Sequence, residues 1–400
     1  MGKNKRYDGY RPYQYLEAGK DYTDYQVSAG DRRVAEWLIP LDEEQESRVD
    51  FLAENLVFID AHSHPFHFPL HIERDMDAYN RQGRMKCAYE ELSRSYFDGI
   101  FDNLMDGACA IVSKNGWKYE DVIHDIGMRL CDLAHQNFII RCEKLEDFER
   151  ARREGKIALV LVLEGATPIE NELDRIEVLY GLGIRQMGVT YSDANLLGSG
   201  IREERDCGLT VFGRQAIERM NKVGMLIDVS HCGPVTALES IQCSTKPILL
   251  SHTGAKALWN SKRLFPDDVL KACAERGGVI GVEAAPHTTM TKTQATHCMK
   301  SVFEHFEYIR SLCGIDHVTF GVDALYGDHV GAHHYYATRL STKSIQGSGF
   351  EEAEYVRGME NPTEASKNIL RYLVKSGYGD DDIRKVLGGN VMRVLGENWG

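Results

Sequence analysis

Side chains that commonly ligate metal ions stand at the ends of several short apolar runs. His62 and His64 follow the first run, and Glu164 ends a later one. Three further runs end in the same way, at His231, His252 and Asp323. If these runs are parallel strands of one closed sheet, their C-terminal ends lie on one face. Side chains that are far apart in the sequence would then converge there.

Imidazole nitrogens and carboxylate oxygens suit Zn²⁺ and related divalent ions. His62 and His64 are two residues apart, so an extended strand places both on one side, where they can hold one ion. A bridging carboxylate allows two ions to lie about 3.5–4 Å apart and to share a hydroxide. Each residue alone also has a structural interpretation, as a packed histidine or a helix-capping carboxylate. Ligand-type residues at so many strand ends favour a metal centre.

The elements that must position these residues alternate along the chain. Apolar runs expected to form strands cover residues 56–60, 108–112, 138–142, 157–164, 184–191, 226–231, 247–252, 278–285 and 318–323. Helical patterns cover residues 120–135, 144–154, 213–223, 266–275 and 299–312. The alternation predicts an α/β fold, a (β/α)8 TIM-like barrel with its site at the C-terminal face of the strands. The short run at 138–142 is the surplus strand for such a barrel.

A doubly wound sheet is the competing α/β architecture. It predicts a Gly-rich phosphate-binding turn after an early strand, but no G-x-G-x-x-G sequence follows any expected strand. Gly198 and Gly200 form only a lone G-x-G. We therefore prefer the barrel.

Composition excludes several classes of protein. The 400 residues include 47 Lys+Arg and 60 Asp+Glu, and this net charge of −13 argues against nucleic-acid binding. A hydrophobic fraction of 43% fits a globular protein. No apolar run is long enough to span a membrane, and the first residues lack the apolar core of a secretory signal. The ten cysteines show no C-x-x-C pair, so we expect reduced cysteines in a cytoplasmic protein.

Two segments fall outside the alternating pattern. Residues 1–50 are polar and Tyr-rich, and we expect them to form an N-terminal extension that packs on a barrel domain at 51–400. Residues 325–350 are rich in Gly, His and Tyr and are expected to form a long loop on the catalytic rim.

Several longer motifs occur in a fixed order between about residues 56 and 396. They are Gly208-Leu209-Thr210, Met220-Asn221-Lys222-Val223-Gly224-Met225-Leu226-Ile227-Asp228-Val229-Ser230-His231, Ser251-His252-Thr253-Gly254-Ala255, Arg263-Leu264-Phe265-Pro266-Asp267-Asp268 and Gly389-Asn390-Val391-Met392-Arg393-Val394. Through them the chain resembles the membrane dipeptidase (renal dipeptidase, peptidase M19) family of the amidohydrolase superfamily. The resemblance implies a homodimeric, metal-dependent barrel. It also implies that a hydroxide bridging two zinc ions per chain hydrolyses dipeptides.

The resemblance also implies a role for each matching residue. His62 and Glu164 match ligands of one zinc, with His64 beside them, and Glu164 bridges to a second zinc held by His231 and His252.

Two further residues match positions that handle the substrate. Arg263 matches an arginine that holds the substrate carboxylate, a task suited to a bidentate guanidinium. Asp323 matches an aspartate beside the substrate amine and the attacking water, and is expected to shuttle a proton.

The chain departs from the family pattern at three places. His62-Ser63-His64 stands where the family has His-x-Asp, and Thr190-Tyr191 where it has Thr-His. Asp323-Ala324-Leu325-Tyr326-Gly327 replaces Asp-Phe-Asp-Gly. A phenol can still donate to an oxyanion, so Tyr191 is expected to bind substrate and assist catalysis.

These departures keep an alternative substrate open, namely a non-peptide amide, lactam or lactone. A metal-binding pseudoenzyme is the alternative of another class. Retention of the ligand set and of Asp323 argues against it.

Overall fold

The computed structural model describes residues 5–103, 118–294, 296–336 and 345–399. A parallel sheet at its centre has the strand order β10-β1-β2-β4-β5-β6-β7-β8-β9, and β3 pairs with β4 outside this path. The strands are β1 (Ile59–His67), β2 (Gly99–Asn103), β3 (Ile139–Arg141), β4 (Ile157–Leu163), β5 (Ile184–Gly188), β6 (Leu226–Asp228), β7 (Leu249–Thr253), β8 (Val279–Val282), β9 (Val318–Phe320) and β10 (Leu325–Tyr326).

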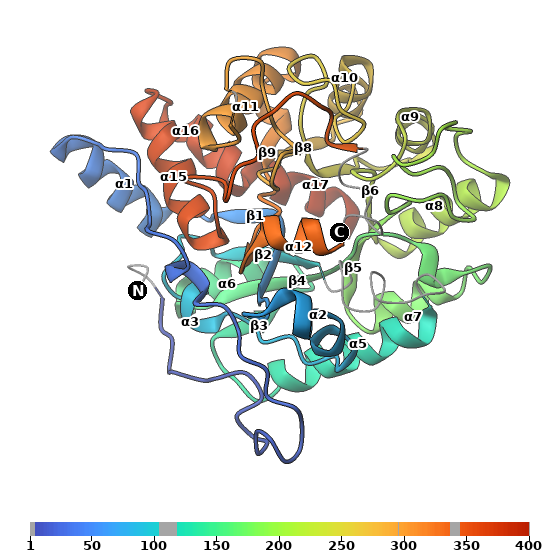
Figure 1. Ribbon diagram of the computed structural model, residues 1–400. Helices are drawn as coiled ribbons and strands as arrows, with labels where there is room; N and C mark the ends of the chain where they lie inside the picture. The colour runs from blue at the N-terminus through green and yellow to red at the C-terminus, as the bar shows by residue number, and fades with distance from the viewer. Residues whose placement is uncertain (1–4, 104–117, 295, 337–344, 400) are drawn as a thin grey trace.

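The sheet curls until its two ends meet. β9 and β10 belong to one stretch of chain, and between them the N–H of Asp323 donates to the carbonyl oxygen of His62 in β1 at 2.8 Å. The N–H of Val322 donates to Oδ1 of Asp60 at 2.9 Å. Helices surround the sheet (Figure 1). This curled α/β sheet confirms the predicted TIM-like fold class.

Helices cover the outside of the sheet. They are α1 (Glu43–Asn55), α2 (Ile72–Arg81), α3 (Tyr89–Leu92), α5 (Tyr119–Leu133), α6 (Glu146–Glu154), α7 (Arg175–Gly181), α8 (Val211–Val223), α9 (Pro234–Cys243), α10 (Asp267–Glu275), α11 (Met299–Cys313), α12 (His329–Tyr335), α15 (Pro362–Lys375), α16 (Asp380–Arg384) and α17 (Asn390–Trp399). The five helical patterns expected from sequence form α5, α6, α8, α10 and α11, each within two residues at either end. No helix among the described residues is long and apolar enough to cross a membrane.

The strand predictions differ from the structure at two places, and the prediction of a surplus strand is confirmed. The run at 108–112 lies outside the described residues, and the strand between β1 and β4 is instead β2. Its sequence, Gly-Ile-Phe-Asp-Asn, contains only two consecutive apolar side chains, which is too short a run to predict a strand. β1 begins at Ile59, not at residue 56, and continues to His67, so His62 and His64 lie within the strand. The surplus run at 138–142 forms β3 at the margin of the sheet.

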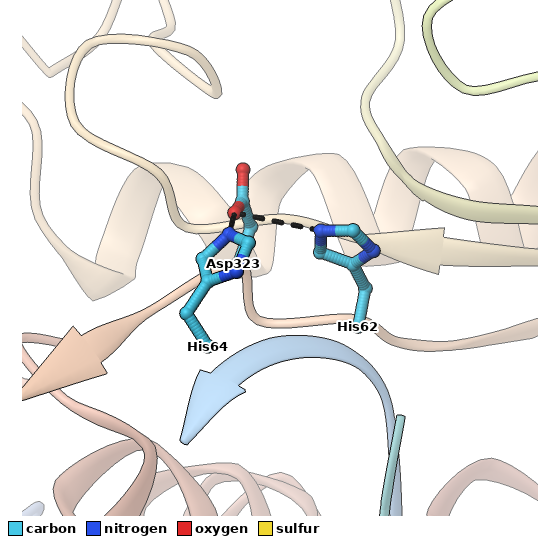
Figure 2. Close-up of side chains that lie close together, drawn as sticks. All are labelled: His62, His64 and Asp323. Atoms are coloured by element: carbon cyan, nitrogen blue, oxygen red, sulfur yellow. Dashed lines mark hydrogen bonds and ion pairs between the residues drawn. The ribbon is translucent and has the colours of Figure 1, made fainter. Parts of the chain in front are cut away.

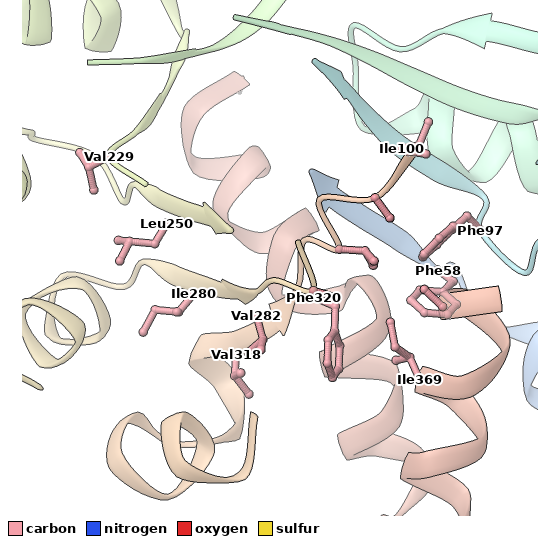
Figure 3. Close-up of a cluster of buried hydrophobic side chains, with 14 of the residues drawn as sticks. Phe58, Phe97, Ile100, Val229, Leu250, Ile280, Val282, Val318, Phe320 and Ile369 are labelled. Atoms are coloured by element: carbon pink, nitrogen blue, oxygen red, sulfur yellow. The ribbon is translucent and has the colours of Figure 1, made fainter. Parts of the chain in front are cut away.

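Strand side chains alternate between two apolar layers. In β4, Leu159 and Leu161 face the layer between the sheet and the helices, whereas Val160 and Val162 face the barrel interior. Figure 3 shows the outer layer, in which Phe320 lies near Ile369. The interior layer contains the first residues of three strands and part of α17, namely Leu226, Leu249, Val279, Val391, Val394 and Leu395. Helix α17 therefore covers the N-terminal ends of the strands, which leaves the C-terminal ends for the site.

The N-terminal segment, residues 5–42, lies along the outside of the barrel (Figure 1, blue). The Tyr10 hydroxyl donates to Asp132 in α5 at 2.7 Å. The N–H of Trp37 donates to Glu364 in α15, also at 2.7 Å. The segment thus contacts two distant helices. The domain boundary predicted at residue 50 falls inside α1 and stays a prediction.

The stretch expected to be one long loop, residues 325–350, is partly regular. It contains β10 and the short helix α12, and residues 337–344 lie outside the described part. Asp328 begins α12 because its side chain accepts a hydrogen bond from the N–H of Gly331 at 2.8 Å. The described part of the expected loop therefore includes a short strand and a short helix.

Gly188 allows β5 to approach the end of β4. A Cβ atom at this position would lie 2.0 Å from the carbonyl oxygen of Glu164. Gly281 allows the same approach of β8 to β7, because a Cβ there would lie 1.9 Å from the carbonyl oxygen of Ser251. Both contacts are with segments that hold candidate ligands.

Gly188→Ala should therefore displace the backbone of Glu164. We expect a loss of about 1–3 kcal/mol in the free energy of unfolding, measured with urea, because the clash is with backbone. Gly127→Ala in α5 is the control, since a Cβ there meets nothing within 4 Å. The free energy of unfolding of the control should rise by about 0.5–1 kcal/mol, because alanine is more favourable than glycine inside a helix. Equal stability of the two variants would show that a Cβ at position 188 does not clash with the backbone of Glu164.

Candidate metal centre

Five strands deliver the candidate ligands to one place. β1 contains His62 and His64, and β7 contains His252. Glu164 follows β4 directly. Two more residues each lie three positions beyond a strand end, His231 after β6 and Asp323 after β9. All six side chains are buried. The structure therefore brings together every candidate ligand that the sequence indicated, together with Asp323.

One carboxylate oxygen lies among three imidazoles. Oε1 of Glu164 is 2.8 Å from Nε2 of His231, 3.3 Å from Nε2 of His252 and 3.6 Å from Nε2 of His62. The Nε2 atoms of His231 and His252 are themselves 3.0 Å apart. Four atoms with lone pairs for a metal thus point at one small volume.

A second group surrounds the carboxylate of Asp323 (Figure 2). Its Oδ1 is 2.9 Å from Nε2 of His64 and 3.7 Å from Nε2 of His62. His62 is therefore shared by both groups. Asp323 has a φ of +51°, a left-handed conformation that aspartate tolerates better than most residues. Asp323 was expected near the ligands from its place at a strand end, and in the structure it contacts two of them.

Burial fixes the charge of these groups. Desolvation lowers the pKa of His62, His231 and His252 well below that of an ordinary histidine. The rings are therefore neutral at pH 7, which is the form that ligates metal. Burial opposes ionisation of Asp323, but the hydrogen bond from His64 and the electrostatic interactions with His252, His62 and His64 together hold the pKa of that carboxyl well below its ordinary value.

A buried relay sets the tautomer of His252. Oγ of Ser251 lies 2.7 Å from Nδ1 of His252 and also donates a hydrogen bond to Oδ2 of Asp228. A hydroxyl has one proton, and the carboxylate accepts it. The serine oxygen must then accept from Nδ1–H of His252. This arrangement leaves the lone pair of Nε2 directed at the site.

The donor set fits a divalent ion. Nδ1 of His62 is buried and has no hydrogen-bond partner among the described residues. Three sets of residues could hold an ion with ligand atoms within 4.8 Å of one another: His62, His64 and Asp323; His62, Glu164 and His252; and His252, Glu283 and Asp323. Neutral imidazoles mixed with carboxylates are the combination that zinc and its neighbours prefer.

An open pocket of about 800 Å³ leads to these residues. Glu164, His231 and Asp323 lie at its base, together with Tyr191. The ring of Tyr191 stacks on His231 with centroids 4.4 Å apart. Apolar and aromatic side chains on its wall include Phe68, Met85, Leu325, Ala332, Tyr336 and Ile345, and polar ones include Asn80, Thr288, His333 and Gln346. A small molecule in this pocket would contact apolar and polar side chains as well as the histidine cluster.

Residues 47–335 match the membrane dipeptidase family, peptidase family M19. The chain belongs to this family. All six clustered residues fall inside the matched region. Rat (Rattus norvegicus) Dipeptidase 3 is 25% identical over 246 residues, which cover 60% of this chain and 45% of that protein. The chain thus spans about half the length of this curated relative.

Two solved structures of similar fold show how widely the likeness extends. An amidohydrolase from Pseudomonas aeruginosa has a TM-score of 0.73 at 23% identity, covering 88% of this chain and 99% of that one. A metallo peptidase from Rhodobacter sphaeroides, liganded with a phosphinate mimic of the dipeptide L-Ala-D-Ala, has a TM-score of 0.65 at 18% identity. It covers 86% of this chain and 99% of that one. At these identities the likeness establishes the fold.

The arginine expected to hold a substrate carboxylate is buried in the pocket wall of this family member. Arg263 is 3% exposed, and its Nη2 lies 2.8 Å from Oε2 of Glu283. Glu283 was missed in the sequence analysis, although it ends the apolar run of β8 as Glu164 ends that of β4. The same strand-end signal would have found it.

The relay predicts an effect of Ser251→Ala on metal binding. Without the hydroxyl, His252 loses the acceptor that keeps the proton on Nδ1, and metal affinity should fall about 10–100-fold. Nitrogen-15 NMR of the histidines should also show that His252 has lost its single tautomer. Ser240→Ala is the control, because Ser240 is equally buried but bonds only within α9. Unchanged affinity in Ser251→Ala would refute the relay.

Proposed function

We propose that the protein is a metal-dependent hydrolase of dipeptides or closely related small amides. The observation that carries the proposal is the oxygen of Glu164 within 3.6 Å of three neutral imidazoles at the base of a pocket. Membership of the membrane dipeptidase family supports it. The dipeptide mimic bound to the Rhodobacter sphaeroides metallo peptidase is consistent with substrates of this size.

The proposed ligands fall into two sets that share Glu164. His62 and Glu164 would hold one ion, with His64 beside them, and His231 and His252 would hold a second, most simply zinc in both places. A divalent ion in such a site lowers the pKa of a bound water and polarises a carbonyl oxygen.

Asp323 is placed to move a proton. Its carboxylate is ionised, lies at the pocket base and accepts a hydrogen bond from His64. We assign it the transfer of a proton from the attacking water to the leaving nitrogen, which a carboxylate at the base of the pocket can perform. Because His64 holds Oδ1, the second oxygen, Oδ2, is the one we assign to this transfer.

Tyr191 is proposed to bind the oxygen that becomes negative in the transition state. Its side chain lines the pocket, and stacking on His231 fixes the plane of its ring. A phenol hydroxyl is a suitable donor to such an oxygen. The pocket therefore contains a candidate ligand set, a base and an oxyanion donor, which is more than a binding pseudoenzyme needs.

Purified protein should contain one to two divalent ions per chain by elemental analysis. His252→Ala should lose at least one ion and nearly all hydrolysis of a dipeptide panel, because its Nε2 faces the shared carboxylate oxygen. His135→Ala, which removes an exposed histidine next to α5, should retain both. Full hydrolysis after exhaustive chelation would refute the proposed function.

Tyr191→Phe should lower kcat by about 10²–10³ and leave metal content unchanged, because it deletes one oxyanion donor and keeps the ring. Tyr336→Phe is the matched control. That hydroxyl is in the same pocket but accepts a hydrogen bond from Asn80 at 2.7 Å. The control should change kcat by less than about threefold. An equally small effect at Tyr191 would assign that residue to packing.

A further inference from the structure

The short helix α12 presents one face to the pocket. His329, Ala332 and His333 of the helix line the pocket at a spacing of three or four residues, which places them on one side of the helix. The rings of His329 and His333 are in contact, with centroids 4.6 Å apart. Gln346 also lines the pocket, and its Nε2 lies 3.4 Å from Nδ1 of His333. We call these three side chains, His329, His333 and Gln346, the α12 subsite.

The side chain of Gln346 is held in one orientation. Its Nε2 also donates to the carbonyl oxygen of Pro286 at 2.9 Å, and its main-chain carbonyl oxygen accepts from the indole N–H of Trp259 at 2.7 Å. An amide nitrogen only donates, so Pro286 and His333 take its two protons. Among the described residues, Oε1 of Gln346 has no hydrogen-bond partner, although Gln346 is only 5% exposed.

His329 is buried in the same way and is also unpaired. It is 8% exposed, and neither of its ring nitrogens has a hydrogen-bond partner within the described part of the chain. Burial lowers the pKa of His329 well below that of an ordinary histidine and lowers the pKa of His333 to about 4. Both rings are therefore neutral at pH 7, and a neutral imidazole has one N–H and one lone pair. A bound molecule that pairs these buried groups would recover the free energy that their burial costs.

The unpaired atoms indicate which chemical group fits the subsite. Oε1 of Gln346 needs a donor, whereas the N–H of His329 needs an acceptor. A carboxylate only accepts, so it would face the lone pairs of Gln346 without any lysine or arginine in the subsite. An ammonium or guanidinium only donates, and an apolar group does neither. A carboxamide offers an NH₂ for Gln346 and a carbonyl oxygen for His329 from one planar group.

We propose that the α12 subsite binds the side chain of the substrate and selects a carboxamide there, such as that of glutamine. His329 and Gln346 determine this preference, and His333 positions the amide of Gln346. The inference rests on the proposed hydrolase function and narrows its substrate class. It concerns the side chain alone and leaves the substrate carboxylate to Arg263.

The test compares dipeptides that differ in one side chain. Alanine is kept at one position, and glutamine, glutamate, methionine or lysine occupies the other, in both orders. In at least one order, kcat/KM of the metal-loaded wild-type protein should be about tenfold or more higher for the glutamine peptide than for the other three. The reason is that a site built to hydrogen-bond a substrate group rejects analogues that leave its own groups unpaired. Ratios below tenfold in both orders overturn the inference.

Variants test whether His329 sets the preference. His329→Phe keeps an aromatic ring without nitrogens, so the ratio of kcat/KM for the glutamine peptide to that for the methionine peptide should fall at least fivefold. His329→Gln keeps a donor and an acceptor and should retain part of the ratio. His334→Phe is the matched control, because His334 is the next residue of α12 after His333 but is exposed and lies beside Glu352. The control should keep the wild-type ratio.

Metal content and the unfolding transition of each variant are measured alongside. A folded, metal-loaded His329→Phe protein that keeps the wild-type ratio overturns the inference. If His329→Phe does not fold, Gln346→Met carries the same expectation, because it removes the unpaired oxygen. If neither variant folds, the wild-type comparison decides.

Binding separates failure of this inference from failure of the proposed function. If the metal-loaded protein hydrolyses none of the peptides, the proposed function fails. Calorimetry of the glutamine and methionine peptides with the same protein then measures the preference directly. Binding of the glutamine peptide that is tenfold tighter or more upholds the subsite without the chemistry, and any smaller difference rejects it.

Discussion

The site depends on one buried charge, the carboxylate of Glu164. Its Oε1 lies among three imidazoles that are themselves kept neutral by burial. Burying a carboxylate costs free energy because its charge loses contact with water, and neutral imidazole rings offset only part of that cost. The neighbouring carboxylate of Asp323 adds to that cost. The fold therefore brings together an excess of negative charge and lone pairs that a cation would balance.

The supporting structure holds the ligand-bearing segments at fixed distances. Asp228 accepts hydrogen bonds from the N–H groups of Ser230 and Ser251, at 3.0 and 3.1 Å. Arg263 donates to the carbonyl oxygens of Ser230 and His252 from the other side. An anion and a cation thus join the same two loops. A small change at either one would be transmitted to His252, because the loops have little freedom between them.

Much of this arrangement could be predicted from the sequence, and the exceptions have physical reasons. The apolar runs of β4 to β9 indicated their strands because parallel strands are buried on both faces. β2 was missed because Ile100 and Phe101 are flanked by glycine and polar residues, which hides so short a strand. The extension of β1 to His67 depends on pairing with β10, a long-range contact that local pattern cannot reveal. The contact of Arg263 with Glu283 was not predicted because it joins distant segments, although the position of Glu283 directly after β8 is a signal that could have been used.

The N-terminal segment has a consequence for the order in which the chain acquires its final structure. The N–H of Trp37 bonds to Glu364, and that of Ile39 bonds to Asn368 at 2.9 Å. On the ribosome the segment emerges before these partners, which are synthesised more than 300 residues later. The part of the segment around Trp37 and Ile39 can therefore attach only when α15 has formed, whereas the part around Tyr10 can attach earlier to α5. Closure of so long a loop is slow compared with local helix formation, so docking of the Trp37 region on α15 would be a late step of folding.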